Sequence, residues 1–323
     1  MLAGGRSVPP ELGSGKPVTL AFGGDVNYEG TLRARLAEDP ESLLAEAAPL
    51  LSGADVAMVN LETAVTERGT PADKEFTFRA PATAFASLAA GGVDVVTLAN
   101  NHGVDFGPEG LADTLAAAQA ADADGFPLVG AGADATAAYT PWVTQVRGQR
   151  IGFLAATQVL DANLGSWVAG PGHPGLAVAQ DPSELLFAVQ ALRPDVDTLV
   201  VYLHWGTELE ACPTARQQEL ARALVDAGAD VIVGGHAHIP LAAGMLDGSV
   251  IDYGLGNFQF GSARGQTAAS GVLTVTVTGQ RVEGYQWHPM TIVDGSPEPL
   301  DASSTELALT AWNESRECSG LEP

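Results

Sequence analysis

Short apolar runs alternate with longer helix-like segments between residues 18 and 234, and this alternation limits the chain to layered α/β structure. The apolar runs predict strands at residues 18–22, 55–60, 93–98, 151–155, 198–204 and 230–233. The segments between them predict helices at residues 40–51, 81–90, 108–121, 182–192 and 213–227. Several of these helices open on a proline, and Gly91 and Gly228 stand where helix C-caps are expected.

The pattern changes after Gly248, where short alternating runs predict strands at residues 250–253, 272–277 and 284–287. We interpret these strands as a second, antiparallel sheet, and residues 303–313 as a closing helix. The chain is then one compact α/β domain at residues 18–300, built from two sheets and outer helices. A flexible tail is expected at residues 1–17, and a C-terminal helix and tail at residues 301–323.

The formal net charge is −24, from 15 Lys and Arg against 39 Asp and Glu. We expect this surface to repel acidic lipid headgroups, acidic polymers and nucleic acid, which excludes nucleic acid as a partner. No run approaches the roughly 18 apolar residues that a membrane-spanning helix needs. The first 17 residues lack a signal-peptide pattern, so the chain is either cytoplasmic or separated from its targeting segment. Their linker-like composition favours an exported chain, secreted or held at the extracellular face of the membrane.

Cys212 and Cys318 are the only cysteines, which is too few for a disulfide framework, and their spacing is not that of a CxxC metal site. They could pair, which would hold the C-terminal tail beside the helix that opens at residue 213. Two unrelated thiols are the alternative.

Polar residues that bind divalent metals stand almost wholly at the carboxyl ends of the predicted strands, where open α/β sheets place their ligand sites. In GGDVN, Asp25 follows the first strand, although an Asp in this place is commonly only a turn residue. In VNLETAV, Asn60 and Glu62 end the second strand. The two oxygens of Glu62 could bridge two cations, and an ordinary surface carboxylate is the alternative.

The stretch LANNHGVDFG places four polar residues after a buried strand, and buried polar groups need partners. The four polar residues are Asn100, Asn101, His102 and Asp105. A turn whose amides cap the next helix is the alternative explanation.

Two further motifs carry histidines. In VVYLHWGTE, His204 ends an apolar strand and Glu208 follows it, although a lone His there is more often a satisfied core residue. In VIVGGHAHIP, two glycines let the backbone turn and expose His236 and His238. Neutral imidazoles suit zinc, iron, nickel or manganese, so this motif is the strongest single indication of a metal. A G-x-S-x-G nucleophile elbow and a GxxxxGK[ST] phosphate loop are both absent.

At these motifs the sequence resembles the bacterial capsule synthesis protein family named for poly-γ-glutamate capsule assembly, a branch of the calcineurin-like metallophosphoesterase superfamily. The resemblance spans roughly residues 18–260. It includes GGDV, NLET, FTFRAP, TLANNHGVDFG, GAG, LHWGTE, QQELARALVDAGADVIVGGHAHI and YGLGNF.

The resemblance implies a four-layer α-β-β-α sandwich of metallophosphoesterase type, with two mixed sheets flanked by helices. It also implies two divalent ions (manganese, iron or zinc) at one edge, with Glu62 bridging them. Asp25, Glu62 and His238 would hold one ion, and Glu62, Asn101, His204 and His236 the other. His102 would be the general acid that protonates the leaving group. Residues expected to bind substrate or support the ligands are Asn27, Asn60, Asn100, Asp105, Arg79 and Glu208.

Two departures from the wider superfamily bear on function. The opening D-x-H motif reads Asp25-Val26-Asn27, so the first ion could be weakly held or absent, or Asn27 could bind substrate instead. Glu62 stands where phosphoesterases usually carry G-D-x-x-D.

Lys74 and Arg79 could hold an anionic substrate group, or be ordinary surface charges. Residues 159–175 could form a loop over the site or a peripheral insertion.

The leading hypothesis is a metal-dependent hydrolase that cleaves a phosphoester or an amide in cell-envelope or poly-γ-glutamate metabolism. Its expected partners are an envelope polymer or small anionic substrate and membrane-bound polymer synthase subunits. A non-catalytic accessory subunit for capsule assembly or export is the alternative. A relative that keeps the fold and has lost one metal is the third hypothesis, and Asn27 is the residue that supports it.

Overall fold

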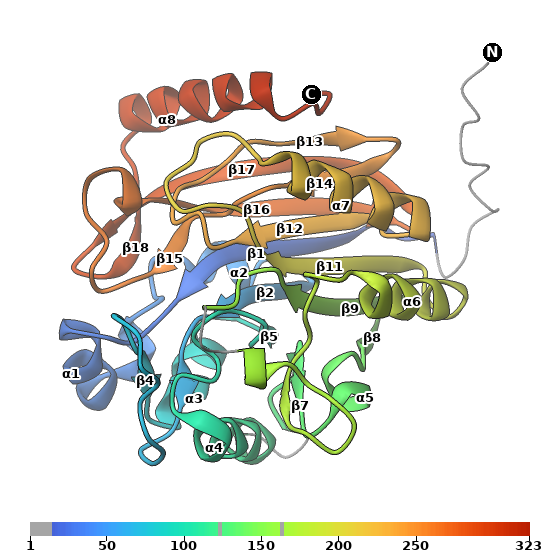
Figure 1. Cartoon of the computed structure of the whole chain (residues 1–323). Coiled ribbons are helices and arrows are strands. Elements are labelled where there is room, and N and C mark those ends of the chain that lie inside the picture. Colours follow the sequence, from blue (N-terminus) through green and yellow to red (C-terminus); the bar gives the residue numbers. More distant parts are fainter. Residues whose placement is uncertain (1–14, 122–124, 162–164) are drawn as a thin grey trace.

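Two β-sheets lie face to face, with helices packed on the outer face of each (Figure 1). The computed structural model describes residues 15–121, 125–161 and 165–323. The four layers confirm the predicted α-β-β-α sandwich of two mixed sheets. The predicted tail at residues 1–17 falls mostly outside the described residues.

The larger sheet has eight strands, which include the first and the last of the strands predicted from the sequence. β1 lies at its centre, parallel to β2 on one side and antiparallel to β16 on the other, and β15 pairs with the end of β1. In spatial order the strands are β18 (Ser296–Pro299), β17 (Arg281–Val293), β16 (Ala269–Thr278), β1 (Val18–Val26), β2 (Val56–Leu61), β5 (Val95–Thr97) and β6 (Leu128–Val129), with β15 (Asn257–Gln259) beside β1.

The smaller sheet has six strands, of which the four central ones are parallel and the two edge strands antiparallel. In spatial order they are β13 (Ala243–Leu246), β14 (Ser249–Asp252), β12 (Val231–Gly235), β11 (Thr198–His204), β9 (Gln149–Thr157) and β8 (Trp142–Val146). Two short pairs lie outside both sheets: β3 (Ala64–Val65) with β4 (Arg79–Ala80), and β7 (Ala131–Gly132) with β10 (Gly175–Leu176).

Alternation along the strands sorts side chains between the layers. In β11, Val200 and Tyr202 face the core between the sheets, whereas Val201 and Leu203 face the outer helices. On the larger sheet the outer layer contains α1 (Thr31–Glu38), α2 (Ala48–Leu51), α3 (Thr83–Ala90) and α4 (Gly107–Ala120). On the smaller sheet it contains α6 (Ser183–Leu192) and α7 (Ala215–Ala227), with α5 (Ala135–Ala138) nearby, and α8 (Ala302–Glu314) packs against β17. No helix in the described residues is long and apolar enough to cross a bilayer.

The prediction of a separate antiparallel sheet after Gly248 is wrong. β14 joins the smaller sheet parallel to β12, and β16, β17 and β18 extend the larger sheet from the edge of β1. The alternation of β16 correctly indicated one buried face, because Leu273, Val275 and Val277 lie in the core between the sheets. Alternation indicates which side chains are buried but does not determine which strand supplies the hydrogen-bond partner.

The single helix predicted at residues 40–51 is also wrong. The segment contains a 3-10 turn at Pro40–Ser42 and the short helix α2, which are separated by turns. Pro49 has no backbone N–H, so a continuous helix through it would lose a hydrogen bond and clash with the preceding turn. The helix instead begins anew with Pro49 in its first turn.

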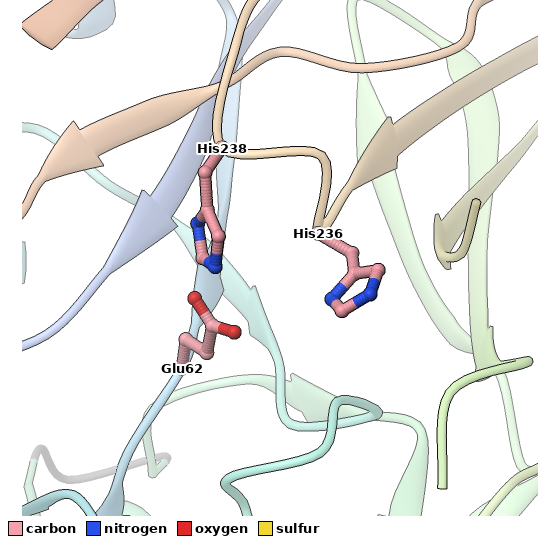
Figure 2. Close-up of side chains that lie close together, drawn as sticks. All are labelled: Glu62, His236 and His238. Carbon is pink, nitrogen blue, oxygen red and sulfur yellow. The ribbon is translucent and has the colours of Figure 1, made fainter. Parts of the chain in front are cut away.

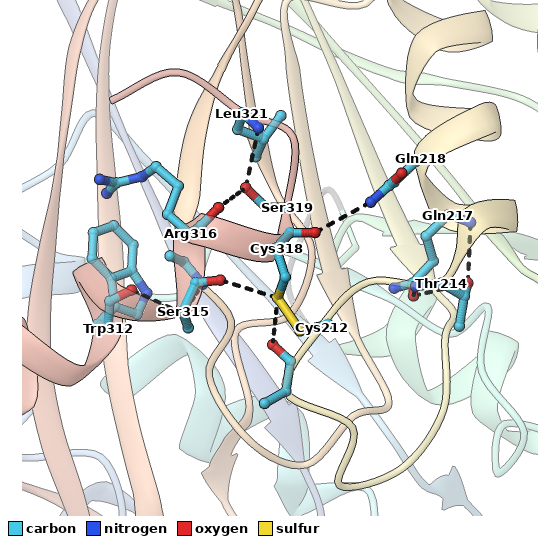
Figure 3. The surroundings of a disulfide bond; sticks show 12 residues. Cys212, Thr214, Gln217, Gln218, Trp312, Ser315, Arg316, Cys318, Ser319 and Leu321 are labelled. Atoms are coloured by element: carbon cyan, nitrogen blue, oxygen red, sulfur yellow. Dashed lines mark hydrogen bonds between the residues drawn. A yellow bond between two sulfur atoms is a disulfide. The ribbon is translucent and has the colours of Figure 1, made fainter.

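A disulfide joins Cys212 to Cys318 across 106 residues of sequence. It ties the segment before α7 to the C-terminal turn, and Figure 3 shows the hydrogen bonds around it, including one from Gln218 to the carbonyl of Cys318. Of the two alternatives left open by the sequence, the structure has the paired one.

We expect the Cys212→Ser, Cys318→Ser double variant to lose about 2–4 kcal/mol of unfolding free energy, because the cross-link restricts the unfolded chain. Urea unfolding with and without dithiothreitol measures the loss. Reductant should bring the wild type down to the stability of the double variant, which should itself not respond. A wild type insensitive to reductant would contradict a stabilising disulfide.

Asp252, at the end of β14, is fully buried, and only one of its oxygens has a hydrogen-bond partner among the described residues, the backbone N–H of Gly254. Burial raises the pKa of this carboxyl group to about 8. Between about pH 4 and pH 8 the native carboxyl group therefore keeps a proton that the unfolded chain releases, so stability falls as the pH rises.

The Asp252→Asn variant cannot ionise, so it should gain stability over the wild type progressively between pH 5 and pH 8, by at most about 1.4 kcal/mol per pH unit. Urea unfolding across this pH range measures the difference. Asp226→Asn, an exposed site on α7, is the matched control and should show no such trend. A gain that does not depend on pH would contradict a buried, protonated Asp252.

Candidate metal centre

The six predicted metal ligands converge at the edge where the parallel strands of both sheets end. The larger sheet contributes Asp25 near the end of β1, Glu62 directly after β2 and Asn101 after β5. The smaller sheet contributes His204 at the end of β11, and His236 and His238 after β12. Asp25, Glu62 and His204 are completely buried, and only His238 has a partly exposed side chain.

The backbone is shaped to bring the two sheets this close. A Cβ atom on Gly235 would lie 2.3 Å from Oδ1 of Asp25, across the two sheets. Within the larger sheet, one on Gly24 would lie 1.8 Å from the carbonyl oxygen of Gly256, which precedes β15. His236 and His238 have positive φ angles of 89° and 56°, in the region that non-glycine residues rarely adopt. Backbone strain of this kind clusters at functional sites, where surrounding structure holds it in place.

Two groups of ligand atoms are close enough for a metal ion. Donor atoms of Glu62, His236 and His238 lie within 4.8 Å of one another, and so do donor atoms of Asp25, Glu62 and His204. Figure 2 shows the Glu62 carboxylate pointing toward the His238 ring, with His236 beside it. Because Glu62 belongs to both groups, it stands where a bridging ligand would. These groups differ from the division of the histidines implied by the family resemblance, which assigns His238 to the ion of Asp25. His238 does approach Asp25 at 3.5 Å, and the division stays a prediction.

The donor set fits a cation because several buried donor atoms make no hydrogen bond within the described part of the chain, although Nε2 of His204 approaches Oε1 of Glu62 at 3.4 Å. Both carboxylate oxygens of Glu62 and Nδ1 of His236 are buried without a hydrogen bond among the described residues. A buried ionised carboxylate without compensation is strongly destabilising, whereas carboxylate and imidazole are common ligands of zinc, iron and manganese. The orphaned atoms therefore face the space that an ion would fill.

Electrostatics favour the ligating form of two histidines. Burial lowers the pKa of His204 and of His236 to about 3, so both imidazoles are neutral at physiological pH. At His238 burial also lowers the pKa, but the charges of Glu62 and Asp25 outweigh it and raise the pKa overall. Burial and the neighbouring Glu62 raise the pKa of Asp25. Neutral His204 and His236 cannot compensate the charge of Glu62, so of the three histidines only His238 can do so when no cation is bound.

A chain of asparagines orients the ligands. Nδ2 of Asn60 donates to Oδ1 of Asp25 at 2.8 Å and lies 3.1 Å from Nδ1 of His204. Nδ2 of Asn100 donates to Oδ1 of Asn60 at 2.9 Å, and Asn101 Oδ1 lies 2.9 Å from His204 Nε2. These contacts link both sheets, so Asn60 and Asn100 fix the positions of the ligands rather than face the substrate.

His102 has a fixed orientation at the edge of this cluster. Its Nδ1 lies 2.7 Å from Oδ2 of Asp105, and its ring stacks on Phe78 with centroids 3.9 Å apart. Asp105 is fully buried and also accepts the backbone N–H of Phe78 at 2.6 Å. Lys74 neutralises Asp105 at 2.7 Å and bonds the Asn101 carbonyl, so it is an internal tie rather than a free cation.

A cavity of about 590 Å³ opens beside the metal centre, within the range of small-molecule sites. Among the predicted residues, His102, His238, Asn27 and Glu208 line it. Oδ1 of Asn27 accepts backbone N–H groups of Glu29 and Gly261, so this side chain is bound to the wall. The other lining residues are Glu29, Glu75, Phe76, Thr77, Phe78, Leu209, Asn257, Phe260, Ser262, Ala263 and Thr267.

The structure does not bring Arg79 to this cavity, because its guanidinium group lies over the Phe106 ring at 4.8 Å. In residues 159–175, Asp161 pairs with Lys74 at 2.8 Å, and none of the described part of this segment lines the cavity.

Sequence reasoning missed Asn257, whose Oδ1 lies 2.8 Å from Nδ1 of His238. The YGLGNF motif that contains Asn257 was the available signal.

Residues 19–262 match the family described as "Bacterial capsule synthesis protein PGA_cap". The chain is 32% identical over 236 residues to "Capsule biosynthesis protein CapA" of Bacillus anthracis, covering 72% of this chain and 56% of that protein. It is 31% identical over 267 residues to "PGA biosynthesis protein CapA" of Bacillus subtilis (strain 168), covering 82% and 68%. A "Probable polyglutamine synthesis accessory protein" of Mycobacterium tuberculosis (strain CDC 1551 / Oshkosh) is 33% identical over 211 residues, covering 63% and 55%.

The fold also resembles a solved structure. A hypothetical protein from Thermus thermophilus aligns with a TM-score of 0.50 at 16% identity, covering 87% of this chain and all of that one. At this identity the likeness concerns the arrangement of the elements alone.

Proposed function

Because this chain belongs to the bacterial capsule synthesis protein family, we propose that it is a metal-dependent hydrolase of cell-envelope polymer metabolism. The observation that carries the proposal is Glu62, which is buried, is shared by two groups of ligand atoms and has no hydrogen bond to either oxygen from the described residues. A purely structural carboxylate in such a place would be strongly destabilising. The scissile bond is a phosphoester or an amide, and the ions are manganese, iron or zinc.

The ions, when bound, would polarise the substrate and lower the pKa of water. The chain's own residues do the rest. Asp105 holds the proton of His102 on Nδ1, which leaves Nε2 without a partner among the described residues. His102 lines the cavity, so a protonated Nε2 is placed to donate its proton to a leaving group there. Phe78 excludes water from one face of the ring.

We place the protein outside the cytoplasm, secreted or at the extracellular face of the membrane. The disulfide between Cys212 and Cys318 supports this, because disulfides persist in oxidising compartments and are rare in the cytosol. Relatives named for capsule and PGA biosynthesis support an envelope polymer as the substrate and polymer synthase subunits as partners. This chain spans about half the length of the B. anthracis relative.

A second candidate is a non-catalytic accessory role in polymer assembly or export. Two observations favour it: the M. tuberculosis relative is named as an accessory protein, and Asn27 stands where the superfamily has an imidazole. Backbone N–H groups occupy Oδ1 of Asn27, so this position supplies no imidazole and one of the two ions would be held less firmly.

Metal content decides between the two candidates. Protein purified without chelator, and protein reconstituted with Mn²⁺ or Zn²⁺, would be analysed by elemental mass spectrometry and assayed on phosphoesters and γ-glutamyl amides. We expect about two equivalents, with chelator-sensitive turnover, and neither in an Asp25→Ala, His236→Ala variant. Absence of metal after reconstitution would overturn the hydrolase in favour of the accessory role.

A further inference from the structure

The cavity beside the metal centre is acidic and aromatic, and from this we infer that the substrate carries a protonated amine next to the bond that is cleaved. The inference rests on the proposed function, because it names the substrate class of the same site. An amino-terminal end of a peptide-like chain has this chemistry. A polyanion lying along the cavity does not.

The cavity is continuous with the metal centre. His102 and His238 line it together with Asn257, which fixes the His238 ring. His102 is only 6% exposed, and its Nε2 has no hydrogen-bond partner among the described residues. Because His102 lines the cavity, this ring nitrogen is available to a ligand group bound there.

Three carboxylates, Glu29, Glu75 and Glu208, line the cavity, and no lysine or arginine does so among the described residues. Three cations adjoin lining residues in the sequence, and each has other partners. Lys74 is paired with Asp105 and Asp161, the Arg79 guanidinium lies over the Phe106 ring, and Arg264 donates to the carbonyl oxygens of Gly261 and Ala263. Glu29 accepts the backbone N–H of Arg79, whereas Glu75 and Glu208 are exposed at the mouth. The outer cavity therefore attracts cations and repels anions.

Aromatic rings line the same cavity as these carboxylates. Phe76 is 61% exposed, an unusual position for a large apolar side chain, and Phe78 and Phe260 pack edge to face with centroids 5.9 Å apart. The faces of aromatic rings attract ammonium groups, and more strongly where water is excluded. Rings and carboxylates together bind an ammonium group better than they bind a neutral alcohol of the same shape.

With metal bound, the inner part of the site would carry positive charge, whereas the outer part carries negative charge. Two divalent ions would exceed the charge of their two carboxylate ligands, Asp25 and Glu62, so the metal-loaded floor attracts a carbonyl or anionic oxygen. The mouth attracts the ammonium. A substrate with both groups is bound in one direction only, which places the bond between them beside His102.

The test compares two probes of equal shape, 2-phenylethylammonium and 2-phenylethanol, by calorimetric titration of the zinc-loaded protein. We expect the ammonium probe to bind about tenfold more tightly than the alcohol. In a Glu75→Gln, Glu208→Gln variant its affinity should fall about fivefold, while that of the alcohol stays constant. The control is Glu306→Gln, Glu314→Gln, which removes the same charge from exposed positions on α8.

Equal affinity for the two probes, or an equal loss in the control variant, would overturn the inference, because long-range charge would then explain the binding. The titration does not require turnover. A protein that binds the ammonium probe as described and hydrolyses nothing would contradict the proposed hydrolase and leave the cation-binding cavity intact. A protein that hydrolyses amides without preferring the ammonium probe would support the proposed hydrolase and contradict the cation-binding cavity.

Discussion

The Glu62→Gln variant should lose both bound ions, with metal affinity lowered more than about 100-fold, because even residues that only orient metal ligands change affinity about 10–100-fold. Glutamine has the same shape but no charge and only one ligating oxygen. Glu62 is the one residue common to both groups of ligand atoms in the described structure, so its loss affects both. The metal content measured by elemental mass spectrometry and the rate of turnover should fall together.

Stability provides an independent measurement for the same variant. Without metal, Glu62→Gln should be more stable than the wild type, because it removes a buried charge whose oxygens have no hydrogen-bond partner among the described residues. With metal the order should reverse, since only the wild type gains binding free energy. Glu46→Gln, at an exposed position, should change neither quantity. A metal-free Glu62→Gln protein that is less stable than the wild type would contradict the interpretation of Glu62 as a ligand.

The His102→Asn variant should lower kcat roughly 10²–10⁴-fold on substrates with a basic leaving group, because general acid catalysis contributes on that scale. Leaving groups such as p-nitrophenolate do not need protonation, so the same variant should turn over nitrophenyl substrates with a much smaller loss. Metal content should stay at the wild-type value, which separates proton donation from ligation.

His173→Asn is the control for this prediction, since His173 is exposed and does not line the cavity. An equal loss for both leaving groups would contradict proton donation by His102. It would indicate instead that the ring, stacked on Phe78, only positions the substrate. The Asp105→Asn variant should show the same leaving-group dependence if Asp105 fixes the tautomer of His102.

The order of elements could be predicted from the sequence because each one carries its own local signal. The strand predicted at residues 198–204 coincides with β11, whose side chains alternate between two buried layers. The pairing of β16 with β1 could not be predicted, because it links residues more than 240 positions apart and leaves no local pattern. Whether Cys212 and Cys318 pair could not be decided from the sequence for the same reason, because pairing depends on a distance that only the fold sets.

The candidate ligands could be predicted because strand ends meet at one edge of a parallel sheet. His204 is the last residue of β11 and His236 directly follows β12, and these two strands are neighbours. The cavity was not predicted, since Phe76, Glu75 and Leu209 reach it from loops whose paths no periodicity describes. Arg79 was an expected substrate contact on the basis of charge alone, and its guanidinium group packs on an aromatic ring instead.

The two sheets supply donors of different elements. Asp25, Glu62 and Asn101, from the larger sheet, offer only oxygen, and the three histidines of the smaller sheet offer only nitrogen. Oxygen donors alone suit magnesium, calcium or manganese, whereas added imidazoles shift preference toward zinc, iron and other transition metals. The oxygen donors are also translated first, since His204 follows Asn101 by more than a hundred residues. In the proposed metal site, selection among ions would therefore be a property of the assembled sandwich and would require a nascent chain extended past residue 238.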